Sequence, residues 1–114
     1  MTLQDIIDQL NLMLLTDTKN FTEISPTNGY VSDLLSCVMA GAQHGGVWVT
    51  LQAHVNIVAV AALLELSAVI ITENAIPDEA TIARANQEGV TLLSTNKTSF
   101  FITGQLWEMG LRAN

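Results

Sequence analysis

Basic side chains are scarce in this sequence. Its 114 residues include four lysines and arginines against 11 aspartates and glutamates, which gives a formal net charge of −7 at pH 7. A nucleic-acid-binding surface must neutralise several phosphates, and four cations spread over the whole chain cannot do so. Anionic membrane surfaces are disfavoured for the same reason. We therefore expect neither nucleic acid nor membrane among the partners.

Cysteine and histidine are also rare. Cys37 has no second cysteine for an intrachain disulfide, and no histidine lies at a spacing that would activate it as a nucleophile. His44 and His54 lie ten residues apart, which is not the paired spacing of metal ligands. A glycine-rich phosphate loop is absent as well. We expect no metal, no cofactor and no catalytic residue, and we expect Cys37 to be a small core or interface residue.

Charged residues of both signs make up only 13% of the chain, against about 25% in an average globular protein, while hydrophobic residues make up 49%. A small domain with so little charge exposes neutral polar or apolar surface, and such surface is often covered in an oligomer. The length suits one domain, residues 1–114, around a single core. We expect a homodimer or a domain bound to a partner protein.

One apolar run, residues 57–72, approaches the length of a membrane span. Glu65 interrupts the run, and Val69, Ile70 and Ile71 give its second part a β-branched character. A helix followed by a buried strand explains this composition better. The chain also begins without the charged and apolar regions of a secretory signal, so a cytoplasmic location is expected.

Strands and helices are predicted to alternate through the second half of the chain. Apolar β-rich strands and helical segments follow one another at residues 47–51, 57–66, 68–72, 78–88 and 90–93. Such alternation implies parallel strands with helices on both faces of the sheet. With a further strand predicted at residues 12–15, the expected fold class is a three-layer α/β/α single domain with a largely parallel sheet of about five strands.

The first half of the chain gives weaker signals. Thr2 is a candidate N-cap, with Asp5 at the acidic position of a capping box. Ser32 is predicted to cap a second helix, and Asp33 to stabilise its first turn. One face of that helix is predicted to carry Val31, Leu34, Leu35, Val38 and Met39.

Polar side chains follow three of the predicted strands. They are Gln52, His54 and Asn56, then Thr72, Glu73 and Asn74, then Ser94, Thr95 and Asn96. Because ligands of parallel sheets bind at the carboxyl ends of the strands, these residues form the expected ligand site. The alternative is ordinary helix capping, with Asn56 as a cap and His54 exposed.

A last helix is predicted from about Thr98 to Met109. It carries five large apolar residues, namely Phe100, Phe101, Leu106, Trp107 and Met109. This helix either offers a docking face to a partner or simply covers the sheet.

Several of these segments also resemble one family. The similar stretches are 29–35, 47–50, 56–58, 70–72 with Pro77 and Asp78, and 93–95. Together they resemble the DRTGG domain, a small α/β regulatory module similar to the amino-terminal domain of HPr kinase/phosphorylase and to the regulatory domain of phosphotransacetylases.

The resemblance implies a non-catalytic regulatory module over residues 1–114, dimeric, sensing a small nucleotide-like ligand or controlling a partner protein. A ligand-free protein–protein interaction adaptor is the alternative, and an enzyme of unknown chemistry is a third. The sequence departs from the family where relatives carry a Gly-Asp-Arg turn, because this chain has Gln52-Ala53-His54 there. An arginine at a helix start can clamp a phosphate, so its loss weakens the case for nucleotide binding.

Overall fold

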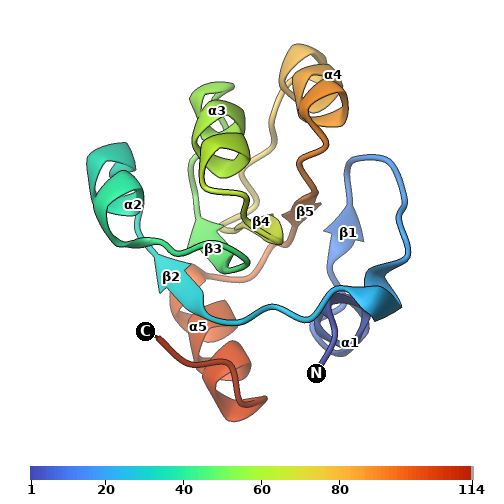
Figure 1. Ribbon diagram of the computed structural model, residues 1–114, viewed down its shortest axis with the longest axis vertical. Helices are drawn as coiled ribbons and strands as arrows, with labels where there is room; N and C mark the ends of the chain where they lie inside the picture. Colours follow the sequence, from blue (N-terminus) through green and yellow to red (C-terminus); the bar gives the residue numbers. More distant parts are fainter. Residues whose placement is uncertain (114) are drawn as a thin grey trace.

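Helices lie on both faces of one central sheet (Figure 1). The computed structural model describes residues 1–113. The strands in this range are β1 (Met13–Leu14), β2 (Gly29–Val31), β3 (Val47–Thr50), β4 (Ala68–Ile71) and β5 (Leu92–Ser94). The helices are α1 (Leu3–Gln9), the 3-10 helix η1 (Phe21–Glu23), α2 (Leu35–Gly41), α3 (Asn56–Leu63), α4 (Glu79–Glu88) and α5 (Ser99–Glu108).

The sheet has the strand order β1-β5-β4-β3-β2. Strands β2 to β5 pair in parallel, and β1 adds an antiparallel strand through the pairs Met13 with Ser94 and Leu14 with Leu93. At the other margin, the backbone N–H of Gly29 donates to the carbonyl of Arg112 at 3.0 Å. The predicted sheet, largely parallel with about five strands, is confirmed. We call the side of the sheet where β3, β4 and β5 finish its carboxyl end.

The two faces of the sheet build two buried clusters. Val47, Val49 and Ile70 face α1 and α5, whereas Trp48 and Val69 face α2, α3 and α4. This alternation follows from the strand period of two, as predicted for Trp48 and its neighbours. Every residue of β3 and β4 is buried, which is why both strands have continuous apolar sequences. The three-layer arrangement is therefore confirmed.

Capping residues begin several of the helices as the sequence indicated. Thr2 and Asp5 form a capping box at α1, in which each side chain accepts from the other's backbone N–H. Asp78 accepts from the N–H of Thr81 at the start of α4, and Thr98 from that of Phe101 at the start of α5. The apolar run at residues 57–72 divides into α3 and β4, and no helix within residues 1–113 has the length and apolarity of a membrane span.

The prediction around Ser32 was wrong. Val31 belongs to β2, a strand that the sequence pattern did not reveal, and α2 begins only at Leu35. Asp33 lies outside the helix, where its Oδ1 accepts from the Thr50 hydroxyl and from the N–H of Leu51, both at 2.8 Å. The carboxylate therefore joins the end of β2 to the end of β3 and does not stabilise a first helical turn.

The expected apolar face of this helix is also incomplete. Val38 is buried, but Leu34 and Met39 are exposed. Cys37 is exposed on α2 as well, so it is not a core residue.

Candidate functional site

A hollow of about 340 Å³ opens at the carboxyl end of the sheet. The loop after β4, the loop after β5 and the turn between α1 and β1 surround it. Most of its lining side chains are neutral amides and hydroxyls, and the lining consists of Asn11, Met13, Asn74, Ala75, Ile76, Ser94, Thr95 and Asn96. We call it the amide hollow. It lies where α/β folds bind their ligands.

Backbone hydrogen bonds hold the two main loops of this hollow together. The N–H of Glu73 donates to the carbonyl of Lys97 at 2.8 Å, and that of Asn74 to the carbonyl of Thr95 at 3.1 Å. Glu73, Asn74 and Asn11 have φ values of 62°, 60° and 51°. Asparagine tolerates this left-handed region better than most residues, so Asn11 and Asn74 suit the sharp reversals that bring their amides to the hollow.

A second hollow of about 330 Å³ adjoins the first. Its lining includes His54, Val55, Asp78 and Thr81, and we call it the His54 hollow. Ile76 lines both hollows and is 75% exposed, so one apolar side chain borders the two.

Asp78 supplies the negative charge of the His54 hollow. Hydrogen bonds from the side chain and the backbone N–H of Thr81 lower the pKa of Asp78, and nearby His54 lowers it further. The Asp78 carboxylate is therefore ionised at neutral pH.

The structure brings five of the nine predicted site residues to these hollows. Asn74, Ser94, Thr95 and Asn96 line the amide hollow, and His54 lines the other. The side chains of Gln52, Asn56, Thr72 and Glu73 are absent from both linings.

The side chains of three of these four residues, Gln52, Thr72 and Glu73, form hydrogen bonds with other parts of the protein. The Gln52 amide donates to the carbonyl of Asp33 at 3.1 Å. The hydroxyl of the fully buried Thr72 lies 2.6 Å from that of Ser99. The Glu73 carboxylate accepts from the N–H of Ser99 at 2.9 Å.

At the start of α3, His54 takes the capping role that was expected of Asn56. Asn56 was expected to cap this helix, but it is the first helical residue. Its backbone N–H donates to Nδ1 of the exposed His54 at 3.2 Å. His54 therefore supplies the hydrogen-bond acceptor that Asn56 was expected to provide.

Among the other lining residues, Asn11, Ile76 and Asp78 were not predicted as site residues. Asn11 reaches the hollow because β1 pairs with β5, a contact between distant segments. Ile76 left a signal in the sequence, because it is an apolar residue in a polar loop before Pro77.

Comparison with known structures identifies the fold. The chain matches the crystal structure of the CBS and DRTGG domains of the regulatory region of Clostridium perfringens pyrophosphatase, complexed with an activator, diadenosine tetraphosphate. The TM-score is 0.73 at 19% sequence identity, over 90% of this chain and 44% of that one. The fold is DRTGG-like. The match thus confirms the expected fold, in a chain that spans less than half of the matched structure. No protein-family model and no curated protein sequence matches the chain.

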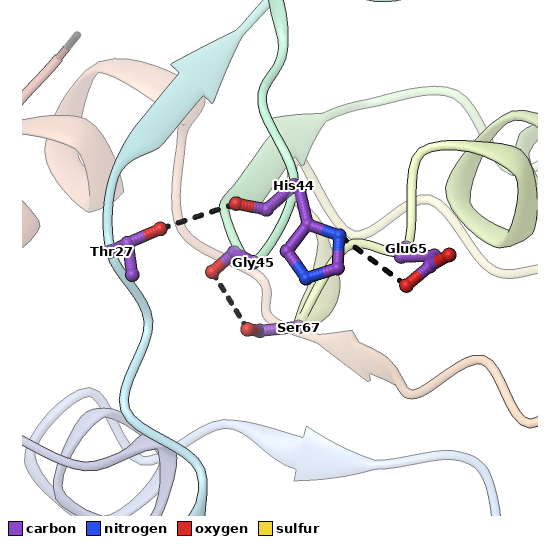
Figure 2. Close-up of polar contacts among 5 residues, drawn as sticks. All are labelled: Thr27, His44, Gly45, Glu65 and Ser67. Carbon is purple, nitrogen blue, oxygen red and sulfur yellow. Dashed lines mark hydrogen bonds and ion pairs between the residues drawn. The ribbon is translucent and has the colours of Figure 1, made fainter.

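The opposite end of this DRTGG-like fold carries a different polar cluster (Figure 2). There His44 Nδ1 lies 3.3 Å from Oε2 of Glu65, with both side chains more than two-thirds exposed. Thr27 donates to the carbonyl of His44, and Ser67 to that of Gly45. Exposed ion pairs contribute little to stability, so this cluster chiefly joins the loops that precede β2, β3 and β4. Across residues 1–113, no group of three His, Cys, Asp or Glu side chains is placed to hold a metal ion.

Proposed function

We propose that this domain is a non-catalytic regulatory module that senses a small ligand at the carboxyl end of its sheet. The observation that carries the proposal is the pair of adjoining hollows that share Ile76, where polar hydrogen-bonding groups surround an apolar side chain. Binding pockets commonly combine a few placed polar groups with apolar surface, and volumes of this size lie near the lower end of the usual range of about 300–1,000 Å³.

The structural neighbour supports a regulatory role, because it is a regulatory region complexed with an activator nucleotide. In this chain a ligand would contact the β4–α4 loop, the β5–α5 loop and the turn before β1 at the same time. Its binding energy would favour one arrangement of these loops. A homodimer or a partner protein that contacts α4 or α5 would then respond to the ligand through that shift in population.

Thermal unfolding of the domain against a panel of nucleosides, nucleotides and small metabolites tests this proposal. A ligand present at one hundred times its dissociation constant adds about 2.7 kcal/mol of stability, which raises the melting temperature of a domain of this size by about 10 °C. Asn74→Gly should abolish the rise, since it removes an amide from the hollow while glycine adopts the positive φ freely.

Glu65→Gly is the matched control for that variant. Glu65 also has a positive φ, 51°, but lies at the other end of the sheet. This variant should keep the ligand response of the unmodified protein. A response that survives Asn74→Gly and disappears with Glu65→Gly would refute the site.

A second function, a ligand-free adaptor that dimerises, is favoured by the outer surface of α5. Phe100 is 91% exposed, Trp107 is 53% exposed, and Phe101 is 45% exposed. Large aromatic side chains at an interface often contribute most of its binding energy. The sequence left open whether this helix docks a partner or covers the sheet, and the structure shows that Ile102 and Leu106 cover the sheet while the aromatic residues face outward.

Sedimentation of variants that place a charge on the outer surface of α5 tests whether this surface forms a dimer. Phe100→Glu is expected to weaken dimerisation at least about thirtyfold, the effect of losing roughly 2 kcal/mol at an interface centre. Leu63→Glu is the control, because Leu63 is 68% exposed and belongs to α3, which lies on the opposite face of the sheet from α5 (Figure 1). A dimer that tolerates Phe100→Glu would exclude this surface. A stable dimer with no ligand response would make the adaptor the leading function.

A further inference from the structure

We infer that the carboxyl end of the sheet takes an uncharged ligand of the nucleoside class and rejects its phosphorylated forms. This inference rests on the proposed ligand-sensing function and specifies its ligand. It follows from what occupies the helix starts beside the hollows, from the charges nearby and from the chemistry of the lining.

The helix starts that could hold a phosphate are already filled by the protein. At α5 the Glu73 carboxylate accepts from the N–H of Ser99 at 2.9 Å, and the Thr98 hydroxyl accepts from that of Phe101 at 3.1 Å. At α4 the Asp78 carboxylate accepts from the N–H of Thr81 at 2.8 Å. Phosphates bind helix starts through these same N–H groups. Two carboxylates therefore stand where a phosphate of the ligand would need to bind.

Lysine and arginine side chains that could compensate are lacking around the hollows. Lys19 donates to the carbonyl of Gly89, Arg84 pairs with Glu88 on α4, and the Arg112 guanidinium lies 4.5 Å from the centre of the Trp107 ring. Lys97 is next to Asn96, but its ammonium lies over the Phe101 ring at 5.7 Å and does not line either hollow. A phosphorylated ligand would meet carboxylates without a guanidinium clamp, which costs binding energy.

The lining is nevertheless rich in groups that bind neutral polar molecules. Asn11, Asn74 and Asn96 each present an amide with both donors and an acceptor, and such amides pair with the edges of nucleobases through two hydrogen bonds. The exposed Ile76 offers an apolar surface to the face of a ring.

The division into two hollows suits a ligand that has two parts. A base would lie in the amide hollow, and a sugar would lie in the His54 hollow. There Asp78 uses Oδ1 to cap α4, and its second carboxylate oxygen can accept from ribose hydroxyls.

Calorimetric titration with adenosine, AMP, ATP and diadenosine tetraphosphate tests the inference on the whole chain. We expect adenosine to bind most tightly, and the dissociation constant to rise about fivefold with the first phosphate through repulsion by nearby carboxylates. Glu73→Gln should reduce the ratio of the AMP dissociation constant to the adenosine dissociation constant. Glu108→Gln, the same change of charge at the other end of α5, should leave this ratio unchanged. The ratio should also shrink as salt is added.

The other outcomes separate this inference from the proposed function. If AMP, ATP or diadenosine tetraphosphate binds more tightly than adenosine and Asn74→Gly removes that binding, the site stands and the ligand class is wrong. If a free sugar or another non-nucleoside compound binds there and adenosine does not, the ligand class is again wrong. If no compound binds at all, the ligand-sensing function fails together with this inference.

Discussion

Trp48→Ala is expected to lower the free energy of unfolding by about 3–5 kcal/mol, the range measured when buried aromatic residues are reduced to alanine. Trp48 is fully buried in the cluster between β3 and helices α2 and α3. Its indole N–H donates to the carbonyl of Ser32 at 2.8 Å. The variant would therefore leave both a large cavity and a carbonyl without its partner just before α2.

Urea unfolding followed by circular dichroism measures this loss. Trp107→Ala provides the comparison, because Trp107 is the other tryptophan and is 53% exposed. We expect its substitution to cost well under half as much, since most of the side chain already contacts solvent. Equal losses for the two variants would contradict the assignment of Trp48 to the core.

Gly46→Ala, which adds one methyl group, is expected to lower the free energy of unfolding by about 1–3 kcal/mol, the usual effect of overpacking a tight site. A Cβ there would lie 2.5 Å from Oδ1 of Asn28 and 3.0 Å from the carbonyl oxygen of Gln43. Asn28 is buried, and its amide is held by a hydrogen bond to the Thr27 hydroxyl, so it cannot move aside freely.

Gly104→Ala is the matched substitution with the opposite expected sign. Gly104 lies inside α5, and a Cβ there would have no atom within 4 Å. Alanine in the middle of a helix is favoured over glycine by about 0.5–1 kcal/mol, so the melting temperature should rise. A fall of similar size in both variants would show that glycine is needed at these positions for a reason other than steric fit.

Prediction from the sequence worked best for the segment from β3 to β5. Strands buried on both faces have continuous apolar sequences, and the helices between them have clear starts and stops such as Asp78 and Gly89. The strand β2 was missed because it has only three residues beside a turn signal, and only its pairing with β3 makes it a strand. The role of Asp33 depends on the same long-range contact with Thr50 and Leu51.

The candidate site was predictable in position and only partly in composition. The rule that ligands bind at the ends of parallel strands located Asn74, Ser94 and Thr95, which lie at one hollow. It could not show that Thr72 is buried against Ser99, or that β1 brings Asn11 to the same place. Both features depend on how segments far apart in sequence pack, so they cannot be predicted from the composition of the loops.

The two margins of the sheet have a consequence for how molecules of this kind can associate. On one margin β1 has two residues, and on the other β2 has three, with the N–H of Gly29 already bonded to Arg112. Unpaired backbone N–H and C=O groups along a long edge strand allow proteins to stack into fibres or exchange strands. Neither margin offers a template of that length. Contacts between copies of the chain are therefore expected to depend on side chains and not on backbone pairing. Side-chain contacts can be specific for one partner, so the assembly can stop at a fixed number of copies.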